Sequence, residues 1–155
     1  MSRVFLGLGS NLGDKRGYIK KALVFIEERV GEIIALSGFY ETLPYGYDSS
    51  DTYINAVVEI STCIDPAELL LLTQDIEREI GRNNKTVNGE YQDRVIDIDI
   101  LLYDNLILQT AELTIPHPDM HKREFVLKPL AEIAPGFIYP LTGKTITEHY
   151  NIIIG

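Results

Sequence analysis

Two aspartates, Asp97 and Asp99, lie one residue apart in the most apolar stretch of the chain, residues 95–102. The β-branched residues of this stretch predict a buried strand, in which side chains alternate between two faces and both carboxylates share one of them. Two carboxylates so close together repel each other unless a cation lies between them, and hard oxygen ligands suit Mg²⁺. A D-x-D pair is equally consistent with a strand end where both acids reach solvent or pair with Arg94, so this pair alone leaves metal binding open.

Mg²⁺ on the face of a sheet is typical of phosphoryl transfer. Basic residues for binding phosphates occur in two groups, Arg82, Lys85 and Arg94 in one and Lys122 and Arg123 in the other. A small anionic ligand therefore has local positive charge available, although the formal net charge is -9. The net charge argues against nucleic acid or an anionic membrane as a partner, because both require a positive field.

The composition predicts one globular domain over residues 1–155, since 45% of the residues are hydrophobic. No apolar run approaches the roughly 20 residues of a membrane span, and the first residues have no signal-peptide pattern. Cys63 is the only cysteine, which excludes an internal disulfide, and we expect it to pack as a small apolar side chain. These features favour the cytoplasm. The oligomeric state is left open, with a monomer favoured.

The elements around the acidic strand must place its polar face where a ligand can reach it. Apolar periodicity predicts strands at 3–9, 33–42, 53–63 and 95–102, and helices at 17–30 and 66–80. This βαββαβ order is that of an α+β, ferredoxin-like core, an antiparallel sheet with both helices on one face. The other face is left for a ligand or for a C-terminal extension. In that extension we expect a helix at 123–133, a short strand near 137–139 and a helix near 145–150.

The predicted strand at 53–63 alternates clearly and offers Tyr53 and Asn55 to a ligand if they share the face of the aspartates. Two nucleotide-binding motifs are rejected. Residues 143–145 resemble the end of a Walker A loop but lack its first glycine, and the glycines at 7–13 miss the spacing of a dinucleotide fingerprint. His149 has no partner suggested by the sequence and is expected at the surface.

Five motifs occur together and in order, at residues 9–13, 53–57, 93–101, 113–120 and 123–130. In this combination the chain strongly resembles the 6-hydroxymethyl-7,8-dihydropterin pyrophosphokinases of folate biosynthesis, from the first strand to about Pro140. The resemblance implies the ferredoxin-like fold and the transfer of pyrophosphate from ATP to the pterin hydroxymethyl group, with AMP as the second product.

On the nucleotide side, the resemblance implies that Asp97 and Asp99 hold two Mg²⁺ ions that bridge the phosphates of ATP. It implies catalytic roles for these aspartates and for Arg82 and Arg94, which would contact the phosphates. The implied ATP-binding residues are Gln74, Glu77, Arg82, Lys85, Arg94, Ile100, Thr114, His117 and Arg123. For Gln74 and Glu77 the alternative is an exposed helix face, and for Lys85 it is a solvated loop side chain.

On the pterin side, the resemblance implies binding by Thr42, Pro44, Tyr45, Tyr53, Asn55 and Phe125. A flat bicyclic ring stacks between aromatic side chains, and an amide can both donate to and accept from its polar edge. The alternative for Tyr53 and Phe125 is packing in the core.

The chain departs from the family pattern at Leu43, Asn84, Tyr91 and Pro118, where a proline, an arginine, a tryptophan and an aromatic residue are common. Two other functions compete with the one implied. A metal-dependent phosphohydrolase would use the same acid pair with water as acceptor. A ferredoxin-like regulatory module would hold the aspartates for structure alone and would bind no Mg²⁺-nucleotide.

Overall fold

The computed structural model of the chain describes residues 1–42, 52–81 and 95–155. Its elements in chain order are β1 (Ser2–Ser10), α1 (Lys15–Arg29), β2 (Glu32–Leu36), β3 (Tyr40–Thr42), β4 (Tyr53–Thr62), α2 (Pro66–Gly81), β5 (Asp97–Tyr103), β6 (Leu108–Gln109), β7 (Thr114–Ile115), the 3-10 helix η2 (Met120–Lys122), α3 (Glu124–Ile133) and α4 (Ile146–Ile154). None of the helices described is long and apolar enough to cross a membrane.

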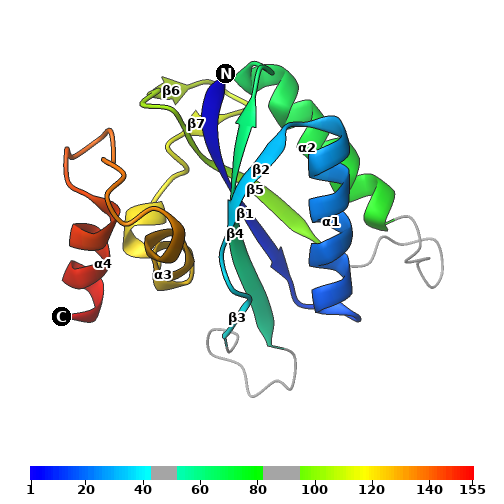
Figure 1. Cartoon of the computed structure of the whole chain (residues 1–155), viewed down its shortest axis with the longest axis horizontal. Helices are drawn as coiled ribbons and strands as arrows, with labels where there is room; N and C mark the ends of the chain where they lie inside the picture. The colour runs from blue at the N-terminus through cyan, green and yellow to red at the C-terminus, as the bar shows by residue number, and fades with distance from the viewer. Residues whose placement is uncertain (43–51, 82–94) are drawn as a thin grey trace.

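The main sheet has the strand order β2-β4-β1-β5, and β3 pairs with β4 beyond the end of β2 (Figure 1). Each of these pairs is antiparallel. The central position of β1 gives it neighbours on both sides, whereas β2 and β5 form the edges. The predicted antiparallel sheet is therefore confirmed.

The single strand predicted at 33–42 is in fact two strands, β2 and β3. The break occurs at Ser37, whose hydroxyl oxygen accepts a hydrogen bond from the Val57 amide at 2.9 Å. That amide would otherwise donate to a backbone carbonyl of the neighbouring strand, so the regular ladder stops there.

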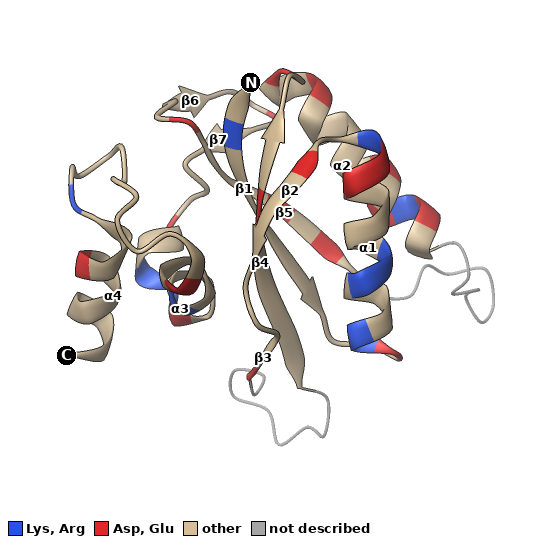
Figure 2. Ribbon diagram, in the orientation of Figure 1, with Lys and Arg blue, Asp and Glu red and all other residues tan. Residues whose placement is uncertain are grey.

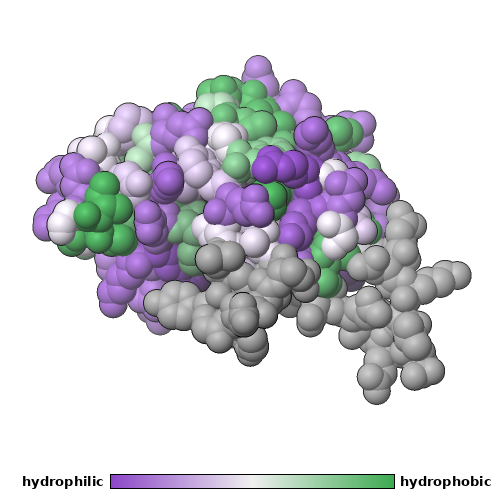
Figure 3. All heavy atoms as spheres, turned by 90° about the horizontal axis from the view of Figure 1, so that it is seen from below, coloured by the Kyte–Doolittle hydropathy of each residue, from purple (hydrophilic) through white to green (hydrophobic). Residues whose placement is uncertain are grey.

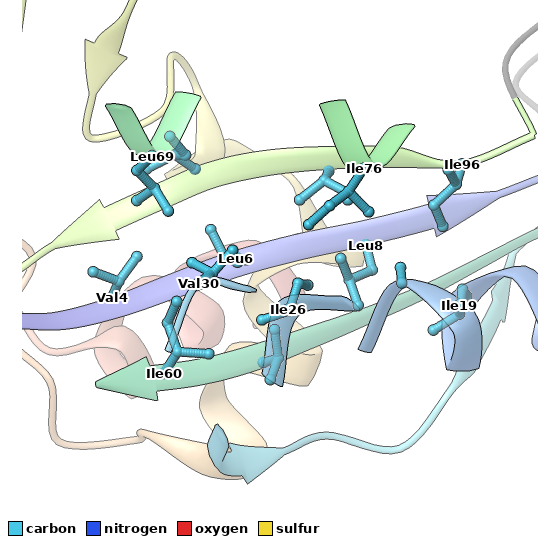
Figure 4. Packing of buried hydrophobic residues seen from close by; sticks show 14 of the residues in the cluster. Val4, Leu6, Leu8, Ile19, Ile26, Val30, Ile60, Leu69, Ile76 and Ile96 are labelled. Carbon is cyan, nitrogen blue, oxygen red and sulfur yellow. The ribbon is translucent and has the colours of Figure 1, made fainter. Parts of the chain in front are cut away.

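Helices α1 and α2 cover one face of the sheet, as predicted. Ile19 and Ile26 of α1, and Leu69 and Ile76 of α2, pack on apolar strand residues such as Leu8 (Figure 4). The start of α2 is also confirmed, because the Asp65 carboxylate accepts a hydrogen bond from the Glu68 amide at 2.9 Å. This core fixes which strand residues point away from the helices.

The C-terminal segment packs on the opposite face, over Phe5, Val57 and Leu101. The predicted helix at 123–133 is confirmed as α3. The predicted strand near 137–139 is only a single bridge, Ile138 to Thr145, and the last helix is longer than predicted. Thr145 and Glu148 begin α4 with a capping box. Figure 3 shows a hydrophobic patch at the end of the molecule where α4 lies.

Two expectations for single side chains are wrong. Cys63 is exposed rather than packed. His149 is only 6% exposed, because its ring packs edge-on against Tyr139 and its Nε2 lies 2.7 Å from the Thr142 hydroxyl. Burial, and then the charges of His121 and Lys144, lower the pKa of His149 from its ordinary value of 6.5, against a smaller opposing effect of Glu148.

The lowered pKa of His149 makes stability depend on pH. Above 6.5 the ring is neutral in both states; as the pH falls toward the lowered folded-state pKa, the unfolded chain takes up the proton first and the folded state loses stability. We expect the free energy of unfolding in urea to fall between about pH 7.5 and 5.5, and to fall less in His149→Gln. An equal fall in both proteins would contradict this assignment.

Candidate active site

One row of paired residues crosses the sheet and brings the acid pair toward the predicted acceptor residues. Asp97 of β5 pairs with Gly9 of β1, and Gly9 pairs with Asn55 of β4. Residues paired across antiparallel strands lie on the same face. Asn55 and Asp97 therefore share the face of the sheet opposite α1 and α2. The sequence offered Asn55 to a ligand only if it shared the face of the aspartates, and the strand pairing meets that condition. Figure 2 shows acidic residues along β5.

Two glycines of β1 place no side chain of their own between these groups. Gly9 separates Asn55 from Asp97, and Gly7 pairs with Asp99 in the next row. A Cβ atom on Gly9 would lie only 3.0 Å from the Asn55 side-chain oxygen. Gly9 is itself buried, and side-chain atoms of Leu101 lie 3.4 Å from the Cβ position of Gly7. Two steps between neighbouring strands span about 10 Å, which is the separation expected between the backbones that carry Asn55 and the acid pair.

The C-terminal segment covers only part of this face. Phe5, Val57 and Leu101 lie beneath it, whereas Asn55 and Asp97 are only half-buried. Phe125, at the start of α3, is 41% exposed, and the Arg123 guanidinium lies 5.9 Å from the centre of its ring. Phe125 is therefore not packed in the core, the alternative that the sequence left open.

On the acceptor side, the structure brings three of the predicted residues together. Thr42 of β3 pairs with Tyr53 of β4, and the Asn55 amide donates to the Thr42 hydroxyl at 3.4 Å. Tyr53 is half-buried. The predicted Pro44 and Tyr45 lie outside the described residues.

On the nucleotide side, a pocket of about 300 Å³ lies beside β5 and leads to Asp99. It contains three of the predicted residues, Ile100, Thr114 and His117, together with Leu70, Ile98, Ala111, Glu112, Leu113 and Pro118. His117 Nε2 is 3.9 Å from an Asp99 carboxylate oxygen. Gln74 and Arg123 do not line this pocket, and Arg82, Lys85 and Arg94 lie outside the described residues. A second hollow, between α1 and β2, contains none of these groups.

Glu77 has a contact that the sequence did not reveal. Its carboxylate accepts a hydrogen bond from the Ile98 amide at 2.9 Å. Ile98 stands between the two aspartates on an edge strand, whose outward amides have no neighbouring strand to pair with. Glu77 therefore holds β5 at the residue between Asp97 and Asp99, and the exposed-face alternative for Glu77 is wrong.

The donor atoms fit Mg²⁺ bound together with a nucleotide. Among the described residues, no group of three His, Cys, Asp or Glu side chains is placed to hold a metal. Mg²⁺ usually keeps several waters and uses one or two carboxylates plus substrate phosphates. Asp97 and Asp99 provide such a pair, and the Asp99 side chain is 55% exposed, so phosphate oxygens have access to it.

The family model of 7,8-dihydro-6-hydroxymethylpterin-pyrophosphokinase (HPPK) matches residues 5–135. The 2-amino-4-hydroxy-6-hydroxymethyldihydropteridine pyrophosphokinase of Porphyromonas gingivalis is 47% identical over 136 residues, which cover 87% of this chain and 92% of that protein. The Aquifex aeolicus enzyme of the same name is 41% identical over 148 residues, covering 96% of this chain and 90% of that protein.

The crystal structure of Plasmodium falciparum HPPK-DHPS has a similar fold, with a TM-score of 0.78 at 18% identity. The likeness covers 97% of this chain but only 43% of that longer chain. The long match to the family model and the identities to the bacterial enzymes show that this chain belongs to the 7,8-dihydro-6-hydroxymethylpterin-pyrophosphokinase family.

Proposed function

We propose that the chain transfers pyrophosphate from ATP to the hydroxymethyl group of 6-hydroxymethyl-7,8-dihydropterin in folate biosynthesis, giving AMP and the pterin pyrophosphate. The observation that carries this proposal is the row of Asn55, Gly9 and Asp97. It sets an amide for a heterocyclic acceptor and an acid pair for a Mg²⁺-nucleotide on opposite sides of a glycine of β1. Neither a phosphohydrolase nor a regulatory module needs this acceptor side.

We assign the whole of residues 1–155 to one pyrophosphokinase domain of ferredoxin-like topology. The strand order β2-β4-β1-β5, with α1 and α2 on one face, supports this assignment. We further propose that the protein acts in the cytoplasm as a monomer on small molecules.

We propose that the pterin ring lies on Gly9 between Tyr53 and Phe125, with its polar edge toward Asn55 and Thr42. The hydroxymethyl group then points along the row to Asp97. ATP occupies the pocket beside β5, where Ile100 and Thr114 contact the base and His117 and Arg123 approach the phosphates. Asp97 and Asp99 would hold two Mg²⁺ ions, which when bound neutralise charge on the phosphate oxygens. The remaining proposed contacts are made by Pro44 and Tyr45 on the pterin side and by Gln74, Glu77, Arg82, Lys85 and Arg94 on the ATP side.

In the proposed reaction the hydroxymethyl oxygen forms a bond to the β-phosphorus of ATP. The bond from that phosphorus to the oxygen bridging it to the α-phosphorus breaks, AMP leaves with this oxygen, and the hydroxyl proton passes to solvent. The chain contributes mainly alignment, because the sheet sets acceptor and nucleotide side by side. Positive charge from Arg82, Arg94 and Arg123 meets the negative charge that builds up on the phosphate oxygens.

Replacing either aspartate by asparagine removes an anionic ligand and keeps the side-chain shape. We expect Asp97→Asn and Asp99→Asn each to lower kcat at least about a hundredfold, while the melting temperature stays equal or rises because the carboxylate repulsion is relieved. The control is Asp75→Asn, which removes the same charge from an exposed position on α2. Near-normal turnover in both site variants would refute the metal assignment.

Removing the Asn55 amide should weaken pterin binding selectively. In Asn55→Ala the polar edge of the pterin loses its partner, which costs about 1–3 kcal/mol, or roughly five- to 150-fold in affinity. Calorimetry with pterin and with a non-hydrolysable ATP analogue measures the two affinities separately. The matched control is Asn151→Ala on α4. Equal losses for both ligands would show that the acceptor site lies elsewhere.

The nature of the products tests the proposed function most directly. The purified chain is incubated with MgATP, with and without 6-hydroxymethyl-7,8-dihydropterin, and the nucleotides are separated by chromatography. We expect AMP to form in step with the pterin consumed and to be absent without pterin. ADP as the main product would indicate an ordinary kinase, and phosphate release without pterin would indicate a hydrolase; either result would refute the proposal.

A further inference from the structure

Glu132, near the end of α3, ties this helix to the chain just before and within β3. The Gly38 amide donates to both oxygens of its carboxylate, at 3.0 and 3.2 Å. The Tyr40 hydroxyl donates to one of the same oxygens. The Lys128 ammonium group lies 5.3 Å from the centre of the Tyr40 ring. One carboxylate therefore joins α3 to two positions of the neighbouring segment.

The residues of α3 that make these contacts lie on the same face of the helix as Phe125. Phe125, Lys128 and Glu132 are spaced by three and then four residues, which places them above one another on one side of an α-helix. Lys128 and Glu132 contact Tyr40, so this side of α3 faces β3. The position of Phe125 relative to the sheet is thus linked to the contact between Glu132 and Tyr40.

Tyr40 also belongs to the row that defines the site. It pairs with Asn55, so the row runs from Tyr40 through Asn55 and Gly9 to Asp97. Two residues along β3, on the same face, Thr42 pairs with Tyr53. Tyr40 therefore lies at the border of the acceptor side, directly beside the amide proposed to bind the pterin edge.

The Tyr40 hydroxyl keeps its proton throughout the neutral range. Its hydrogen bond to Glu132, then burial, then the charge of Glu132 and an effect of Tyr150, raise the pKa of Tyr40 to about 12. The phenol is thus a donor under assay conditions, so deprotonation of Tyr40 does not break the contact.

We propose that Glu132 and Tyr40 are positioning residues for the acceptor substrate. Together they fix the distance between the two walls of the pterin slot, Tyr53 on β4 and Phe125 on α3. This inference rests on the proposed function and deepens it, because it names the contact that sets how closely the two aromatic side chains enclose a flat ring. Neither residue touches the nucleotide pocket, so the nucleotide side does not depend on their contact.

The test compares steady-state kinetics of the full chain and of the variants Tyr40→Phe, Glu132→Ala and their combination. Tyr40→Phe removes one hydroxyl and keeps the ring, so it disturbs folding least. We expect it to raise the KM for pterin about fivefold, and Glu132→Ala to raise it about tenfold, with the KM for ATP and kcat within about twofold of wild type. Because both act through one contact, the combined variant should match Glu132→Ala rather than multiply the two effects.

The matched control is Glu79→Gln, which weakens another exposed contact between two elements, the pair of Glu79 with Arg29 that joins α2 to α1. It should leave the KM for pterin unchanged. Melting temperatures of all variants are measured beside the kinetics, and Glu132→Gln, which retains an acceptor oxygen, should restore part of the pterin affinity.

Three results would overturn the inference while leaving the proposed function intact: an unchanged KM for pterin, an equal rise in both KM values, or multiplication of effects in the combined variant. Absence of pterin-dependent AMP formation by the wild-type chain would overturn both. A wild type that forms AMP beside variants with a selective rise in the KM for pterin would support both.

Discussion

The site depends on the register of β1 between β4 and β5. A strand alternates its side chains with a period of two, so the register that buries Leu6 and Leu8 under the helices also turns Gly7 and Gly9 to the other face. If β5 slipped by one residue relative to β1, its two carboxylates would lie under the helices. Burying Ile98 and Ile100 stabilises the correct register by about 3–6 kcal/mol, whereas two carboxylates about 7 Å apart in a water-like medium repel by less than about 1 kcal/mol. Hydrophobic burial on one face therefore holds the like charges together on the other.

Unequal covering of the two faces turns this arrangement into a site. Helices α1 and α2 pack along the first face, whereas the C-terminal segment covers the second face only over residues such as Phe5 and Leu101. Large side chains such as Phe5 and Leu101 stand where this segment packs, whereas Asn55 and Asp97 are only half-buried. Phe125 lies at the start of α3, the helix that Glu132 holds to the segment before and within β3. The same helix thus completes a hydrophobic core and carries the exposed Phe125.

Local patterns predicted much of this structure. The alternation around Asp97, the alternation of β4 and the cap at Asp65 each follow from neighbouring residues, and each was confirmed. The features that were missed depend on contacts between residues far apart in sequence. The Ser37 hydroxyl replaces a strand carbonyl, Glu77 holds the backbone of β5, and His149 is enclosed by a segment that has no periodicity of its own. The short strands β6 and β7 have two residues each, too few to show alternation.

The charge of the pocket beside β5 matters for the binding of an anionic nucleotide. The pocket beside β5, proposed to bind ATP, contains Asp99 and Glu112 and, among the described residues that line it, a single histidine, His117, so it would repel bare ATP. The proposed function supplies two groups that offset this repulsion. They are cations carried by the nucleotide, which the acid pair is proposed to hold, and the basic side chains of residues 82–94, which lie between α2 and β5 in the sequence. That segment precedes the strand bearing the aspartates in the sequence, and its arginines are proposed to bind the phosphates. On the proposed function, cations held by the acid pair and local basic side chains together allow a protein with a net charge of -9 to act on a highly anionic substrate.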